Sequence, residues 1–204
     1  VTVYSVLDGF HEVNTGLYTS FLFNPVPEKL EIETGVRLDH YMGRWKSNLV
    51  RSRPVANPRF YIAFTPLRNR KNLDYLTVSF GTGLYSNKID MTETMDENDN
   101  LPDRAKQEKC LTNVLGLEML FPAGILLKLE TYYKFYFHRN YINVKLDGSG
   151  KMYNEIWNNG LGHVGGFDLI LKKKISRYFD GLLSYSFIFA RYKNPQAVEY
   201  GSGD

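Results

Sequence analysis

The stretch 124–138, GILLKLETYYKFYFH, divides its side chains into two rows when every second residue is compared. Every odd position carries an apolar or aromatic side chain or a threonine. The charged and imidazole side chains occupy even positions only: Lys128, Glu130, Lys134 and His138. This two-residue period predicts a β-strand with one apolar and one polar face. A helix would place Leu127 on the same face as Glu130 and Lys134, so the helical alternative fails.

The length of this stretch also constrains the fold. Strands of soluble sheets usually contain about five or six residues, whereas the alternation here persists for 15. A strand that crosses a bilayer needs about 9 to 11 residues and keeps apolar groups on the side that faces lipid. The stretch is therefore typical of a transmembrane β-barrel.

Composition alone would not reveal such a fold, because 43% hydrophobic and 23% charged residues also suit a soluble domain. The 15 Tyr and 13 Phe, against 2 Trp, favour a protein that places large side chains at boundaries. The longest apolar run, 119–127, is broken by Pro122 and Gly124, which excludes a membrane helix. A formal charge of +3 is too small to indicate a nucleic-acid partner.

The same alternation recurs along the chain and predicts an all-β protein with about eight strands. The expected strands are 12–23, 29–40, 57–66, 75–84, 106–121, 124–138, 158–175 and 181–191. Short turns at 24–28, 66–74, 122–123 and 176–179 alternate with long segments at 41–56, 85–105, 139–157 and 192–204. Short turns at one end and long loops at the other indicate a transmembrane antiparallel up-and-down β-barrel.

Aromatic side chains gather near both ends of the expected strands. Two groups are expected to form girdles at the membrane interfaces. Those near the long segments are Tyr41, Tyr85, Tyr141 and the aromatic residues at 135–137, and those near the short turns are Phe21, Phe23, Phe64, Phe121 and Phe179.

Several short strings resemble the TonB-dependent outer-membrane transporters. They are NPRF at 57–60, LPDRA at 101–105, LGLE at 115–118, YYK at 132–134, NNG at 158–160, GGFD at 165–168 and LSYS at 183–186. Their order resembles the later part of such a barrel, with Asp168 where the family usually has Glu. The resemblance implies energy-coupled uptake of a scarce ligand, such as a siderophore or other metal chelate, a vitamin or a carbohydrate. The implied partners are outer-membrane lipid, the small-molecule ligand and, through a plug domain, the TonB energy-coupling complex.

Barrels of that transporter size have about 22 strands. We therefore expect residues 1–204 to form one segment of a larger barrel domain, without the plug domain, the signal peptide or the final strands. Two alternatives stay open. One is a self-contained eight-stranded outer-membrane barrel with a structural or adhesive role, and the other is a soluble lipocalin-like binder with apolar residues inside.

The polar rows contain the candidate functional residues. Residues expected to line the lumen and contact the plug or the ligand are Arg37, Glu118, Lys128, Glu130, Lys134 and Asp168. Glu118 and Glu130 could form an acid–base pair, although ion pairing is the favoured interpretation. No arrangement of residues indicates an enzyme, a cofactor or a metal site. The acidic loop 91–103 could hold Ca²⁺, although a solvated or ligand-contacting loop is favoured, and the long segments are expected to recognise the ligand.

Overall fold

Long β-strands account for nearly all the described residues of this computed structural model, namely 2–7, 10–45, 48–51, 54–87, 107–122, 124–146, 152–174 and 180–193. The strands are β1 (Thr2–Leu7), β2 (Phe10–Val26), β3 (Leu30–Trp45), β4 (Asn48–Arg51), β5 (Val55–Arg70), β6 (Leu73–Ser86), β7 (Lys109–Phe121), β8 (Ile125–Leu146), β9 (Met152–Lys174) and β10 (Asp180–Lys193). Within these residues no helix has the length and apolar character needed to cross a membrane.

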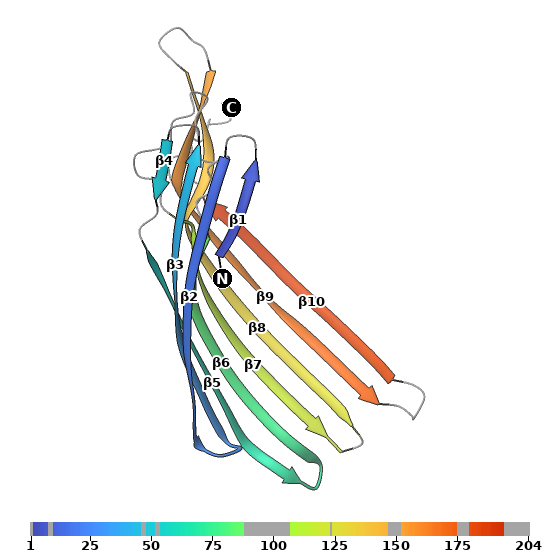
Figure 1. Cartoon of the computed structure of the whole chain (residues 1–204). Helices are drawn as coiled ribbons and strands as arrows, with labels where there is room; N and C mark the ends of the chain where they lie inside the picture. Colours follow the sequence, from blue (N-terminus) through green and yellow to red (C-terminus); the bar gives the residue numbers. More distant parts are fainter. Residues whose placement is uncertain are drawn as a thin grey trace, which may run out of the picture.

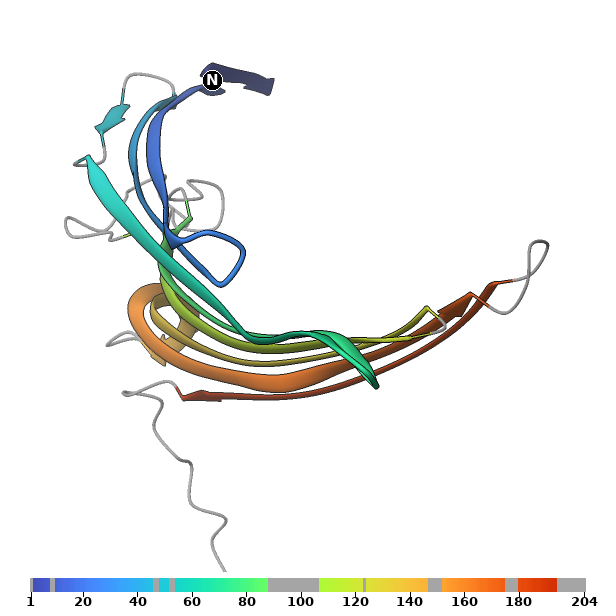
Figure 2. The ribbon, with the colours of Figure 1, turned by 90° about the horizontal axis from the view of Figure 1, so that it is seen from below.

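The strands form one sheet in which sequence neighbours are also spatial neighbours (Figure 1). The order is β1-β2-β3-β5-β6-β7-β8-β9-β10, every pair is antiparallel, and the short β4 pairs with β3 outside this path. The sheet curves strongly, like part of a barrel wall (Figure 2). Among the described strands no ladder joins β1 to β10, so the closed eight-stranded barrel of the first alternative is not formed. The up-and-down β architecture is confirmed.

All eight predicted strands are present, as β2, β3 and β5 to β10. Several boundaries were predicted wrongly. In segment 41–56, expected to be a loop, β3 continues to Trp45 and pairs with β4. Segment 139–157 was expected to be a loop, but β8 continues to Leu146 and pairs there with the start of β9 at Met152. Segment 66–74 was expected to be a turn, but β5 runs to Arg70, so that only Lys71 and Asn72 form the turn. Cross-strand hydrogen bonds extend these hairpins past the point where the sequence alternation weakens.

A β-bulge at His138 explains why the strand was cut short in the sequence interpretation. His138 has a φ of 59°, and the β8–β9 register shifts between Phe137 and Arg139. An extra residue in one strand reverses the alternation beyond it. Arg139 consequently shares a face with Glu108, and its Nε lies 3.5 Å from Glu108 Oε1.

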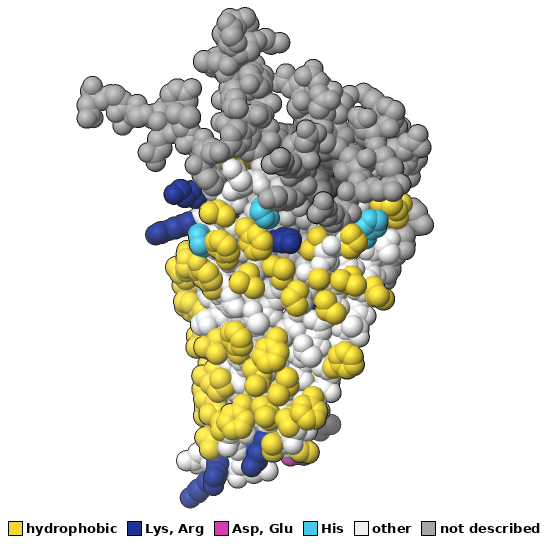
Figure 3. Space-filling model, turned by 90° about the vertical axis from the view of Figure 1, so that its left-hand side faces the viewer, with side chains coloured by type: hydrophobic (Ala, Val, Ile, Leu, Met, Phe, Trp, Pro, Cys, Tyr) yellow, Lys and Arg dark blue, Asp and Glu magenta, His cyan; other side chains and the backbone are white. Residues whose placement is uncertain are grey.

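The convex face of the sheet carries the apolar rows. The register aligns Leu117, Leu129 and Leu169 side by side across β7, β8 and β9. Phe21 and Leu17 on β2 are each 70% exposed, and the hydrophobic side chains cover the middle of this face (Figure 3). An exposed apolar band on the outside is the pattern of a lipid-facing barrel wall. A lipocalin-like protein would place these side chains inside, so the second alternative is wrong.

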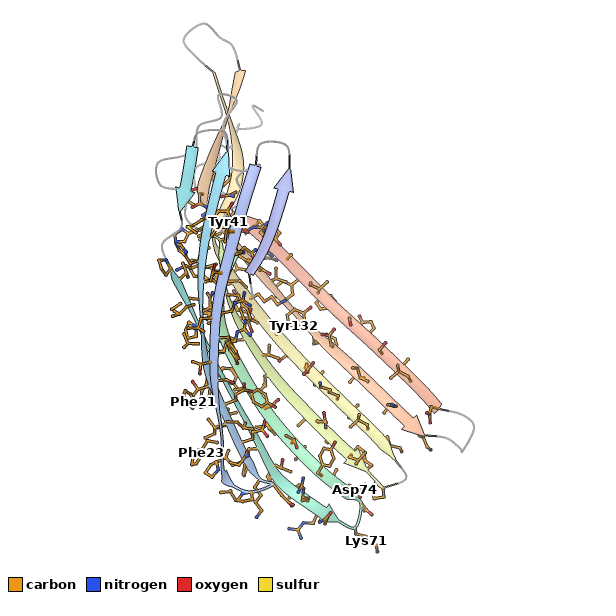
Figure 4. The ribbon with its side chains drawn as sticks, viewed as in Figure 1. Phe21, Phe23, Tyr41, Lys71, Asp74 and Tyr132 are labelled. Atoms are coloured by element: carbon orange, nitrogen blue, oxygen red, sulfur yellow. The ribbon has the colours of Figure 1, made fainter. Side chains whose placement is uncertain are left out.

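The positions predicted for the aromatic girdles are exposed for Phe21, Phe23 and Phe64 at one end, whereas Tyr41 and Tyr85 at the other end lie on the inner face. Phe21 and Phe23 are exposed on β2 near the short turns (Figure 4). At the opposite end Tyr41 is only 1% exposed, and it lines a hollow on the inner face together with Tyr85. Tyr41 is two and four residues from Asp39 and Arg37 on β3, so its side chain lies on the same, inner face of the strand. Phe179 lies outside the described residues.

The two faces can be tested with adjacent substitutions on β8. Leu129→Arg would place a charge in the middle of the apolar band, at a cost of about 2 to 4 kcal/mol. We expect the intact protein to lose most of its folded, membrane-inserted fraction, measured by heat-modifiable gel migration. Glu130→Arg, one residue further on the polar face, should insert nearly normally. Equal damage from both substitutions would contradict the assignment of the faces.

Candidate functional site

The concave face gathers the polar side chains of the sheet. The register places Glu118 opposite Lys128 across β7 and β8, and Glu130 opposite Asp168 across β8 and β9. Directly opposed residues in an antiparallel pair share a face. The same reasoning along the ladders brings all six predicted residues to the inner face: Arg37, Glu118, Lys128, Glu130, Lys134 and Asp168. A role for them in contacting a ligand or plug stays a prediction.

Glu118 and Glu130 line a hollow of about 510 Å³ in the middle of the inner wall. Lys128 Nζ lies 3.1 Å from Glu130 Oε1, and the Tyr75 hydroxyl donates a hydrogen bond of 2.6 Å to Glu118 Oε1. Each carboxylate therefore has its own partner, and the ion pair expected by the sequence interpretation is seen for Glu130, whereas Glu118 accepts a hydrogen bond from a neutral hydroxyl. The Lys128 and Glu130 side chains are 36% and 38% exposed. A pair this open contributes little to stability, about 0 to 1 kcal/mol, and can exchange partners.

Arg59 on β5 is an inner-wall residue that the sequence interpretation missed. Its guanidinium carbon lies 4.6 Å from the centre of the Tyr85 ring and 5.9 Å from that of Tyr18, distances that suit cation–π attraction. Gly83 lies beneath it, and a Cβ there would come within 3.2 Å of Arg59 Cγ. The alternation of Arg59 with the apolar Phe60 and Ile62 is the signal in the sequence that indicates an inward-facing Arg59.

A second polar cluster lies nearer the long connections. Asp39 accepts hydrogen bonds from Arg37 Nε at 2.8 Å and from Asn57 Nδ2 at 2.7 Å. Asn57, which is 2% exposed, also donates to Ser86 Oγ at 2.8 Å. These residues border a hollow of about 210 Å³ together with Gln107. Arg37 is thus held by its carboxylate neighbour, and Asn57 is a further residue that sequence reasoning did not identify.

Two buried amide oxygens in this cluster accept no hydrogen bond from the described residues. Asn57 Oδ1 and Gln107 Oε1 are buried and have no donor among the described residues. A buried polar atom without a partner is costly, about 1 to 3 kcal/mol. The hollow therefore favours an incoming group that donates hydrogen bonds, from a ligand or from another part of the protein.

Lys134 lies apart from these clusters, whereas Asp168 lies beside the central one, opposite Glu130. Lys134 Nζ is 5.4 Å from the centre of the Tyr132 ring and lines a third hollow, of about 340 Å³. Asp168 forms no ion pair with any described residue and lies across the ladder from Ser186 on β10. The structure therefore brings Glu118, Lys128, Glu130 and Asp168 together on neighbouring strands and leaves Arg37 and Lys134 apart from them.

No group of three or more His, Cys, Asp or Glu residues in the described ranges is arranged to hold a metal ion. The acidic segment 91–103 lies outside the described residues. The same holds for residues 88–105 of the expected recognition segment 85–105, and for parts of 41–56 and 139–157.

Gly166 on β9 provides a test of the packing on the inner wall. A Cβ added there would overlap the carbonyl oxygen of Phe187 and lie 2.6 Å from the Tyr132 hydroxyl. We expect Gly166→Ala to destabilise the intact barrel by about 1 to 3 kcal/mol, measured as a lower denaturant midpoint. Gly81→Ala is the matched control, because its nearest neighbour would be an ordinary 3.6 Å away. An unchanged midpoint for Gly166→Ala would show that this close approach is absent.

No protein-family model matches the sequence, and no curated protein matches it. The fold, by contrast, matches solved outer-membrane receptors and transporters. The chain superimposes on the receptor FpvAI, solved in complex with pyocin S2, over 93% of its length, with a TM-score of 0.70 and 11% identity. The FrpB iron transporter from Neisseria meningitidis matches over 90%, with a TM-score of 0.68 and 13% identity. The copper transporter OprC matches over 90%, with a TM-score of 0.63 and 14% identity.

The chain spans only part of these proteins. It corresponds to 25% of the FpvAI chain, 26% of the FrpB chain and 30% of the OprC chain. At such low identity the likeness concerns the fold. The chain therefore has the fold of the β-barrel wall of the TonB-dependent outer-membrane receptors and covers between a quarter and a third of their length.

Proposed function

We propose that the chain is part of the outer-membrane β-barrel of a TonB-dependent transporter, which takes up a scarce ligand by energy-coupled transport. The observation that carries the proposal is the shape of the sheet: an open, curved wall (Figure 2) with an apolar band on its outer face (Figure 3) and charged side chains on its inner face. Its match to FpvAI along 93% of the chain supports a large barrel of this kind.

The inner face supports a wide lumen. A closed eight-stranded barrel has an interior just wide enough for its own side chains. Here the inner wall carries hollows of about 510 and 210 Å³, lined by side chains as long as Arg37, Arg59 and Lys128. Such a wall suits a barrel that encloses a plug or a passing ligand.

Within this proposal the inner side chains act as exchangeable polar partners. The half-exposed pair of Lys128 and Glu130 can release one another and contact a ligand at small cost. Asn57 and Gln107 supply acceptor oxygens in the second hollow. The ligand would be a siderophore or other metal chelate, a vitamin or a carbohydrate, and the TonB complex would act through the plug. FrpB and OprC are named as iron and copper transporters, which favours a metal-containing ligand.

Uptake by the intact protein tests the proposal. Cells that depend on this protein should accumulate one member of a panel of ferric siderophores, copper, vitamins and oligosaccharides. Accumulation should stop when the proton gradient of the inner membrane is dissipated, because the outer membrane itself holds no energy source. Uptake that is indifferent to the gradient would contradict an energy-coupled transporter and favour a passive or structural barrel.

A pair of substitutions tests the inner wall within the same assay. Glu130→Gln removes a carboxylate that can leave Lys128 and contact the ligand, and a lost charged hydrogen bond to the ligand costs about 1.5 to 3 kcal/mol. We expect the apparent affinity of uptake to fall by roughly tenfold or more at unchanged protein level. Thr131→Val, the outward-facing neighbour on β8, should leave uptake unchanged. Equal effects would show that the inner wall has no special part in transport.

A further inference from the structure

The outward-facing charges of the sheet are confined to its margins. Near the long connections, β7, β9 and β10 direct four basic side chains to the convex face, here called the cationic rim. Its members are Lys109, His163, Arg191 and Lys193. Figure 3 shows Lys, Arg and His side chains directly above the hydrophobic band of this face.

The register brings these residues into two adjacent rows. Lys109, Phe137, Leu161 and Lys193 are successive partners across β7, β8, β9 and β10. One step towards the band, Leu111, Phe135, His163 and Arg191 form the next row. Arg191 is thus the direct neighbour of His163, and the cations are interleaved with apolar and aromatic side chains.

Among the side chains that the structure describes, the cationic rim has no carboxylate counterpart on its own face. The carboxylates whose side chains are described on β7, β8 and β9, namely Glu118, Glu130 and Asp168, all belong to the inner row. Among the described residues no carboxylate forms an ion pair with Lys109, Arg191 or Lys193. Almost no acidic side chain is visible on the convex face in Figure 3. The rim therefore presents uncompensated positive charge.

The depth of the rim matches the headgroup region of a bilayer. Phe121 lies 12 residues beyond Lys109 on β7, in the row that contains Lys173 on β9. At about 3.4 Å per residue and a tilt of about 40° this separates the two cationic levels by roughly 30 Å. The hydrocarbon core of a bilayer is also about 30 Å thick. Charges at this level face lipid headgroups.

His163 is held in place by aromatic neighbours on β8. Its Nδ1 lies 2.5 Å from the Tyr133 hydroxyl, and its ring centre is 4.9 Å from that of Phe135. When the hydroxyl donates to Nδ1, the ring hydrogen resides on Nε2. The Nε2–H of the imidazole is then a hydrogen-bond donor in a fixed position next to Arg191. The Arg191 guanidinium itself is well suited to bind phosphate oxygens.

We propose that the cationic rim binds the phosphate of an anionic lipid in the leaflet on the side of the long connections. Charge complementarity selects the headgroup, and the apolar band directly below the rim, including Phe167 and Phe187, accepts the acyl chains. A soluble phosphate would gain only the first of these contacts. The inference requires the membrane location but does not depend on transport.

Lipid binding by the intact protein in detergent tests this inference. Phosphatidic acid and phosphatidylcholine with the same acyl chains are compared by native mass spectrometry, with inorganic phosphate as a competitor. We expect preferential retention of phosphatidic acid that inorganic phosphate does not displace. Equal retention of the two lipids would overturn the proposal, and displacement by inorganic phosphate would show a site for free anions.

Matched variants locate the site. Arg191→Gln and Lys193→Gln should each weaken phosphatidic acid retention about fivefold. Lys173→Gln removes an outward cation at the opposite margin and should leave retention unchanged. Heat-modifiable migration confirms that each variant is folded. An equal effect of Lys173→Gln would show that overall charge, and not the rim, attracts the lipid. Absence of a preference for phosphatidic acid in the unsubstituted protein, with uptake intact, would refute this inference and leave the proposed function standing.

Discussion

Inside a bilayer every backbone N–H and C=O must find a partner within the protein, because no water is available there. The long antiparallel ladders of this chain satisfy that requirement, because they pair backbone N–H and C=O groups between neighbouring strands. The β7–β8 ladder pairs every residue from Lys109 to Phe121 without interruption, and the β8–β9 ladder extends over nearly the whole of both strands. Strand length, hairpin order and the strict division of side chains between two faces all follow from this requirement.

The division into faces then sets the chemistry that each side can perform. The convex face is a continuous apolar band with charges only at its margins, so it is suited to lipid and, at one margin, to lipid phosphate. The concave face has space for long charged side chains and holds them in loose pairs, such as Lys128 with Glu130, or in a tighter cluster around Asp39 and Asn57. The proposed transport and the contact with lipid would therefore use different residues on the same strands.

The alternation of residues was sufficient to predict the eight main strands and the side on which Glu118, Lys128 and Glu130 lie. Its failures have physical causes. The bulge at His138 reverses the parity of β8, so the hairpin beyond it could not be read as a continuation. Tyr41 was predicted to face the membrane interface because it lies near the end of its strand. Its odd-numbered position on β3 instead directs the side chain to the inner face, where it is buried. Proximity to the membrane surface and orientation towards lipid are separate properties.

By itself the sequence determined the class of fold, since a period of two residues sustained over 15 positions is compatible only with a long two-faced strand. It also determined which residues share a face within one strand. Only the tertiary structure decided which residues of different strands meet, because register depends on turns, bulges and hydrogen bonds across the sheet. The Arg59 stack with Tyr18 and Tyr85 and the adjacency of His163 and Arg191 are products of that register and leave no signature in any single segment of the chain.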